Sequence, residues 1–121
     1  MAVKQYKRSD RLAEQILRDI SSLLAQELAD KMPGLVTFTH VRLSDDLRYA
    51  TVYYSYLGDQ AHRDKLDGYL IKENKRIRSL VGRNLRVRTI PEFRFKFDPS
   101  IEEGIRIEQL LNEIRNERKD T

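Results

Sequence analysis

Residues of the types most often used in catalysis are sparse in this chain of 121 residues. It has no cysteine, which excludes thiol nucleophiles, disulfides, cysteine-based zinc sites and iron–sulfur clusters. Its two histidines, His40 and His62, have no metal-ligand spacing to each other or to a carboxylate. Asp45 and Asp46 are of the type that binds Mg²⁺, but adjacent aspartates between two strands more often serve a turn. The sequence therefore predicts a protein that is not an enzyme and that uses no cofactor or metal ion.

The strongest chemical signal is a basic segment, residues 72–96, whose composition suits a polyanionic partner. It holds nine basic and two acidic residues, a net charge of +7, whereas the rest of the chain has 14 basic and 17 acidic residues. Arginine outnumbers lysine by six to three, and a guanidinium group can bind a phosphate through two hydrogen bonds. Unbalanced cations repel one another unless a polyanion is bound, so the segment predicts contact with nucleic acid. Solubility, or binding of another anion, is the alternative.

Two sets of cations are predicted to contact phosphate groups. The primary set comprises Lys72, Lys75, Arg76, Arg78, Arg83, Arg86 and Arg88. The second set, which would extend the surface, comprises Lys4, Lys7, Arg8, Arg11, Arg94 and Lys96. Phosphate contacts supply affinity and position, while base contacts supply specificity, and the sequence does not single out a base-reading residue.

The elements that must position these cations include three helices, predicted from apolar residues at spacings of three and four. They cover residues 9–30, 58–81 and 100–114. The apolar stripe of the second helix is interrupted by Glu73, Asn74 and Lys75, so we expect a kink or break there. Gly82 is expected to end this helix in the left-handed conformation. The chain ends, residues 1–8 and 115–121, are expected to be flexible.

Three strands are predicted at residues 35–43, 48–57 and 85–97 from alternating patterns rich in β-branched and aromatic residues. The first two would form an antiparallel hairpin, and its tyrosines are expected to pack across strands, with base stacking as the alternative. In the third strand the phenylalanines share one parity, which we expect to face the core, and four cations share the other. These cations are Arg86, Arg88, Arg94 and Lys96. The order of elements predicts one two-layer α+β domain over residues 1–121, with a three-stranded sheet.

Four local patterns also occur in order along the chain. They are RLAEQI at 11–16, SDDLRYATVY at 44–53, IRSxxGxxLRxR at 77–88 and PExxFxFDxSxxxG at 91–104. On these patterns the chain resembles the bacterial ribosome-binding factor A family over roughly residues 8–114. The resemblance implies a type II KH-like domain of order α-β-β-α-α-β, followed by a C-terminal helix.

The same resemblance implies a function. Family members bind the immature, free small (30S) ribosomal subunit through its 16S rRNA and assist its maturation, including rRNA end processing. They act in the cytoplasm without catalytic activity, support growth in the cold, and are released with the help of a ribosome-associated GTPase. We further expect a monomer without a membrane partner, since no apolar run is long enough to span a bilayer.

The family usually marks a kink between its middle helices with an Ala-x-Gly pattern in place of the GxxG loop of ordinary KH domains. Aligned on Ile77 and Arg78, that pattern falls at Glu73, Asn74 and Lys75, so this chain has neither the alanine nor the glycine. We expect the kink to persist through Asn74, with Lys75 adding a cation.

Two other functions remain open from the residues alone. A basic DNA-binding module would place a helix of the basic segment in a groove of the duplex. A small metal-dependent hydrolase would use Asp45 and Asp46 to hold the metal ion.

Overall fold

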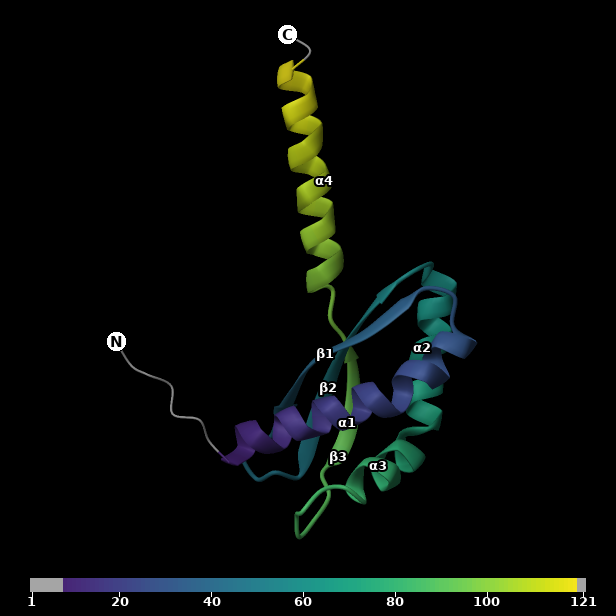
Figure 1. Cartoon of the computed structure of the whole chain (residues 1–121), viewed down its shortest axis with the longest axis vertical. Helices are drawn as coiled ribbons and strands as arrows, with labels where there is room; N and C mark the ends of the chain where they lie inside the picture. The colour runs from purple at the N-terminus through teal and green to yellow at the C-terminus, as the bar shows by residue number, and fades with distance from the viewer. Residues whose placement is uncertain (1–7, 120–121) are drawn as a thin grey trace, which may run out of the picture.

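The computed structural model describes residues 8–119, and its elements follow the predicted α+β order (Figure 1). The helices are α1 (Arg8–Lys31), α2 (Gln60–Lys72), α3 (Asn74–Gly82) and α4 (Ser100–Lys119). The strands are β1 (Leu35–Leu43), β2 (Tyr49–Leu57) and β3 (Glu92–Phe97). The middle helical segment is divided into α2 and α3, as the interrupted apolar stripe predicted.

The three strands form one mixed sheet in the order β1-β2-β3. The predicted hairpin is confirmed, because β1 and β2 pair antiparallel. β3 then runs parallel to β2, with Phe93 beside Ala50 and Phe95 beside Val52. This register places the phenylalanines of β3 on the same face as the buried residues of β2, as their parity predicted.

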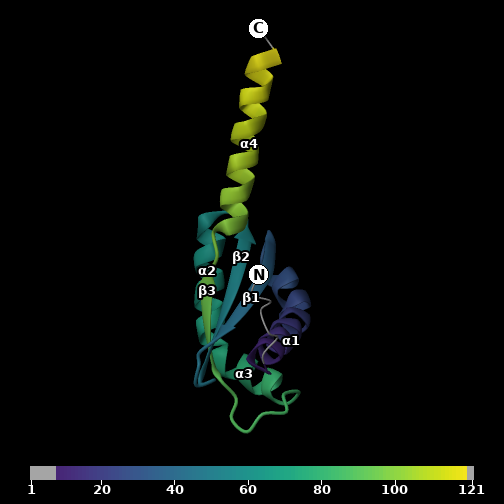
Figure 2. The same ribbon diagram turned by 90° about the vertical axis from the view of Figure 1, so that its left-hand side faces the viewer.

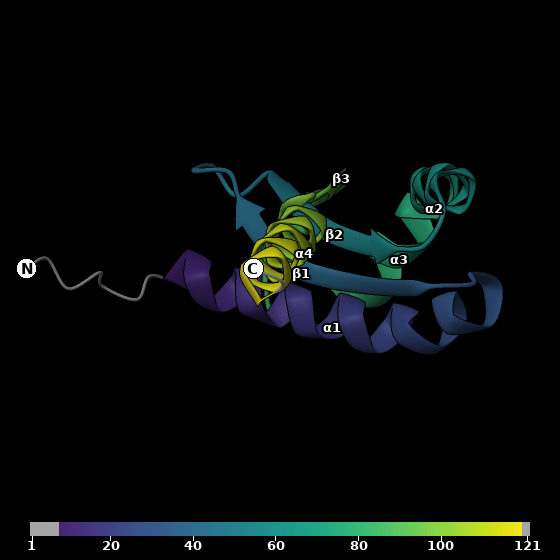
Figure 3. The same cartoon turned by 90° about the horizontal axis from the view of Figure 1, so that it is seen from above.

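One hydrophobic core fills the space between the sheet and the first three helices. Its strand residues include Ala50, Val52, Tyr54 and Tyr56 of β2, all at most 1% exposed. The helical contribution comes from α1, which runs alongside β1 (Figure 3), and from the buried stripes of α2 and α3. Burial of each large apolar side chain contributes about 1.5–3 kcal/mol, so the core determines which face of the sheet is covered by the helices.

The third strand is shorter than predicted. Only residues 92–97 pair with β2, and residues 83–91 form the α3–β3 loop. Glu92 already lies beside Tyr49, the first residue of β2, so a longer β3 would have no strand to pair with. Pro91 also has no N–H group to donate to a sheet. The prediction that Arg86 and Arg88 lie on the sheet was therefore wrong, because both belong to the loop.

Gly82 ends α3, but the predicted left-handed conformation was wrong. Among the described residues only Gly34 and Leu47 have a positive φ. The missing side chain at Gly82 instead allows close packing of the loop, since a Cβ there would lie 2.2 Å from Cδ1 of Ile90. Glycine at position 82 thus allows the α3–β3 loop to pack closely against α3.

The last helix, α4, extends away from the rest of the domain, at the end opposite to the α3–β3 loop (Figures 1 and 2). It continues to Lys119, so residues 115–119, within the end expected to be flexible, are helical. Within the part of the chain that the structure describes, no helix combines the length and the apolar character needed to cross a bilayer.

Candidate nucleic-acid interface

The break between α2 and α3 lies at Glu73, whose backbone (φ −92°, ψ 5°) departs from helical values. The side-chain amide of Asn74 donates a hydrogen bond of 2.7 Å to the carbonyl of Phe93 in β3. Lys72 precedes the break and Lys75 follows it, and both are exposed. Asn74 therefore ties the break to the sheet, while the two lysines face solvent on either side of it.

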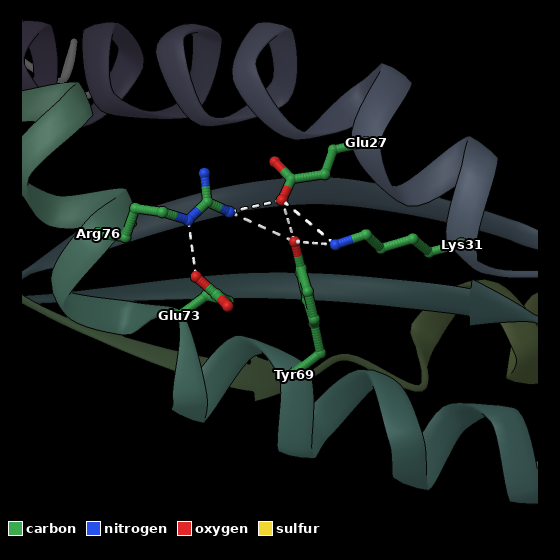
Figure 4. Close-up of polar contacts among 5 residues, drawn as sticks. All are labelled: Glu27, Lys31, Tyr69, Glu73 and Arg76. Atoms are coloured by element: carbon green, nitrogen blue, oxygen red, sulfur yellow. Dashed lines mark hydrogen bonds and ion pairs between the residues drawn. The ribbon is translucent and has the colours of Figure 1, made fainter.

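Arg76 belongs to a cluster that joins α1 to the α2–α3 break (Figure 4). Its Nη2 lies 2.5 Å from Oε1 of Glu27, and its Nε lies 2.6 Å from Oε2 of Glu73. The Tyr69 hydroxyl donates a hydrogen bond to Glu27, and Lys31 Nζ lies 3.8 Å from the same carboxylate. We call these five residues the glutamate–arginine cluster. Two carboxylates compensate the charge of Arg76, whose role as a phosphate ligand stays a prediction.

The cluster shifts the titration of its members. The hydrogen bond from Tyr69, followed by the charge of Arg76, holds the pKa of Glu27 below its ordinary value of 4.5 despite partial burial. Burial raises the pKa of Tyr69, and its bond to Glu27 raises it further. Glu27 is therefore an ionised acceptor near neutral pH, and it stabilises the contact between α1 and α3.

Arg78 also makes contacts within the fold. Its Nε donates to the carbonyl of Pro91 at 3.0 Å, and its Nη2 donates to the carbonyl of Ile90 at 2.6 Å. The side chain is half-buried. Arg78 thus holds the end of the α3–β3 loop against α3, and its predicted phosphate contact is untested.

The remaining cations of the primary set, Arg83, Arg86 and Arg88, lie together on the α3–β3 loop, and we call them the loop arginines. All three are exposed. Among the side chains that the structure describes, no carboxylate forms an ion pair with any of them. These cations are available to an external anion, in contrast to Arg76 and Arg78.

Arg86 and Arg88 line a pocket of about 470 Å³ together with Arg8 and Arg48. We call it the arginine pocket. It lies where the start of α1, the β1–β2 turn (residues 44–48) and the α3–β3 loop meet. Arg8 was predicted in the second set, but Arg48 was missed. Arg48 lies outside the basic segment, and its place in the pocket depends on the tertiary contact between the turn and the α3–β3 loop.

The second set of cations is spread over several elements. Arg94 and Lys96 lie on the outer face of β3, where Arg94 stacks 4.1 Å from the centre of the Tyr49 ring. Arg11 is exposed on the first turn of α1. Lys4 and Lys7 lie outside the described residues. Of the described members of this set, only Arg8 lines the arginine pocket with Arg86 and Arg88.

Asp46 of the β1–β2 turn has the structural role that the sequence favoured. Oδ1 of Asp46 accepts hydrogen bonds from the Ser44 hydroxyl at 2.6 Å and from the Arg48 backbone at 3.1 Å. The bond from Ser44 is the main reason that the pKa of Asp46 lies below its ordinary value. Among the residues whose side chains are described, no group of three or more His, Asp or Glu is placed to hold a metal ion.

A family model described as ribosome-binding factor A matches residues 8–111 of the chain. The chain belongs to the ribosome-binding factor A family. A family member from Geobacter metallireducens is 49% identical over 113 residues, which cover 93% of this chain and 95% of that protein.

Two solved structures from the ribosome-binding factor A family have similar folds. A solution structure of a Thermotoga maritima protein proposed to be a member has a TM-score of 0.64 and 32% identity, covering 78% of this chain and 91% of that one. A Thermus thermophilus model, fitted into a cryo-EM map of a complex with the 30S subunit, has a TM-score of 0.60 and 24% identity. The latter match covers 72% of this chain and 91% of that one.

The break between α2 and α3 bears on one expectation drawn from the ribosome-binding factor A family. The family's Ala-x-Gly pattern is absent here, and the helices are nevertheless interrupted at Glu73. The glycine of that pattern aligns with Lys75, and neither Glu73 nor Lys75 has a positive φ, so the backbone here does not require glycine. Asn74 follows the break and ties it to β3 through its hydrogen bond to the Phe93 carbonyl.

Proposed function

We propose that this protein binds the immature, free 30S subunit through its 16S rRNA and assists its maturation and rRNA end processing. It acts by binding, without catalysis of its own. Membership in the ribosome-binding factor A family and the 30S complex of the Thermus thermophilus protein support this proposal. The observation that carries it is the group of loop arginines, which are exposed and lack carboxylate partners among the side chains that the structure describes.

The physical basis of the proposed binding is electrostatic. Exposed arginines displace counterions from RNA phosphates, and this release supplies much of the affinity of nucleic-acid-binding proteins. The loop arginines are carried on a loop that Arg78 and Ile90 hold against α3, so little order has to be gained on binding. Lys72 and Lys75 at the break extend the same proposed surface.

The proposal also covers where the protein acts, in which oligomeric state, and how it is released. The protein acts as a monomer in the cytoplasm, contributes to growth in the cold, and is released from the subunit by a ribosome-associated GTPase. Each of these follows from the family resemblance.

Co-sedimentation of the purified chain with separated small subunits, large subunits and joined ribosomes tests the proposal. We expect binding to free small subunits alone. The variant R83E/R86E/R88E should lose about a hundredfold in affinity, because three charge-assisted contacts become repulsive. The matched control R18E/R42E/K65E changes the net charge equally at three exposed sites on α1, β1 and α2, and should bind normally.

Two results would count against the proposal. Equal losses for the loop variant and the control would mean that net charge, and not the loop, sets the affinity. Tight binding to duplex DNA without preference for small subunits would favour the DNA-binding alternative.

A further inference from the structure

The arginine pocket has a composition that suits a nucleotide and not merely a phosphate-coated surface. We propose that it receives a single unstacked nucleotide of a folded RNA, with the phosphate on the arginines and the base on an apolar floor. This inference rests on the proposed function and names the RNA feature that the protein would recognise.

The charge of the pocket is suited to phosphate. Its lining carries four arginines and one carboxylate, that of Asp46. Asp46 is occupied by the turn, through Ser44 and the Arg48 backbone, and Arg48 Nε lies 3.8 Å from its other oxygen. Among the described side chains, Arg8, Arg86 and Arg88 have no ion-pair partner. Guanidinium groups from α1 and the α3–β3 loop thus line one cavity without internal neutralisation, and Arg48 of the turn adds a fourth that Asp46 partly neutralises.

The floor of the pocket is apolar. Leu12 of α1, Leu47 of the turn and Val87 of the loop line it together with the arginines. Leu12 and Val87 are half-buried, and Leu47 is 40% exposed. A cavity of about 470 Å³ falls within the range of small-molecule sites, which combine apolar walls with a few placed polar groups. An inorganic anion would use the arginines but not this floor, whereas a nucleotide would use both.

The backbone of the turn provides an independent observation. Leu47 has a φ of 59°, a left-handed conformation that a branched side chain rarely adopts. Its N–H bonds to the Ser44 carbonyl at 2.9 Å, which holds the turn closed. Unfavourable backbone geometry of this kind concentrates at binding sites. Here it places an exposed leucine on the pocket wall, where asparagine or glycine would satisfy the turn more easily.

An RNA strand is a better source of this nucleotide than a free one. Arg86 and Arg88 both lie on the α3–β3 loop, whose exposed Arg83 offers a further cation for the flanking phosphates of a strand. Sequence- and shape-specific RNA recognition commonly uses bases that leave the stack at bulges and loops. We therefore expect a bulged nucleotide to be the preferred ligand.

The test measures fluorescence anisotropy of the full chain with labelled RNA hairpins, one with a single bulged nucleotide and one fully paired. Stacking of one base on an apolar surface predicts about tenfold tighter binding of the bulged hairpin. The variant Leu47→Asn introduces a side chain that tolerates a left-handed backbone, so its melting temperature should equal that of the wild type. Because it removes the apolar wall of the pocket, the preference for the bulged hairpin should disappear. Arg48→Ala should weaken both hairpins, and Arg42→Ala, an exposed control, should weaken neither.

The outcomes separate this inference from the proposed function. Equal binding of the two hairpins by the wild type, or an unchanged preference in Leu47→Asn, would overturn the nucleotide pocket. If that variant also sediments normally with small subunits, the proposed function stands without it. Displacement of the bulged hairpin by adenosine monophosphate as effectively as by unlabelled bulged hairpin would also overturn the proposal, because the ligand would then be a free nucleotide.

Discussion

Two groups of arginines from the same basic segment have opposite environments in the fold. Arg76 and Arg78 on α3 are bound internally, to two glutamates and to two backbone carbonyls respectively. The loop arginines, a few residues further on, are exposed and lack carboxylate partners in the described part of the chain. A local excess of cations in the sequence therefore does not show how many of them are available to bind a partner. Part of the excess on this segment holds the fold together and positions the rest.

The largest effect expected within the internally bound group comes from Arg76→Ala. This change removes the ion pairs of Arg76 with Glu27 and Glu73 and leaves Glu27 with the more distant Lys31, so we expect a loss of about 1–2 kcal/mol in the free energy of unfolding. Urea denaturation followed by circular dichroism measures it. Arg83→Ala is the matched control and should change stability by less than about 0.5 kcal/mol.

The affinities of the same two variants for small subunits should also differ, when measured at a temperature at which both are folded. Arg76→Ala should keep most of its affinity for small subunits, whereas Arg83→Ala should lose affinity in proportion to one phosphate contact. If Arg76→Ala is as stable as the wild type but binds poorly, the division between the two groups is wrong.

A smaller effect is expected from pH acting on the glutamate–arginine cluster. The pKa of Glu27 is lower in the folded chain than its ordinary value of 4.5, chiefly because of the hydrogen bond from Tyr69. The carboxyl therefore stabilises the fold fully above that value, and the contribution is lost as the pH falls through the lowered pKa. The stability difference between the wild type and Glu27→Gln should shrink below pH 4.5. A difference that stays constant down to acidic pH would argue against this ionised contact.

The fold was predictable where local patterns agree with long-range pairing. The strand at residues 35–43 and the alternation of Ala50, Val52 and Tyr54 were predicted correctly, because the core imposes the same period that the residues show. The third strand was predicted too long because a period of two continued through residues 85–91. Its end depends on where β2 begins, which no pattern within the segment reveals.

The candidate site was less predictable, for a related reason. Glu27 lies 49 residues from Arg76, so the sequence could not indicate that this cation is paired. Arg48 joins Arg86 in one pocket only because the β1–β2 turn and the α3–β3 loop meet in space. Short-range charge counting identifies the cations, but the tertiary contacts decide which of them remain open.

The salt dependence of binding to free small subunits tests whether the loop arginines contact the RNA. If about five phosphates are neutralised, the logarithm of the wild-type affinity should fall with the logarithm of salt concentration at a slope of about −4. The variant R83A/R86A/R88A should have a slope less negative by about 3, since each lost phosphate contact reduces it by about one. Arg76→Ala should keep the wild-type slope. Equal slopes for the wild type and the triple variant would contradict the claim that the loop arginines contact the RNA.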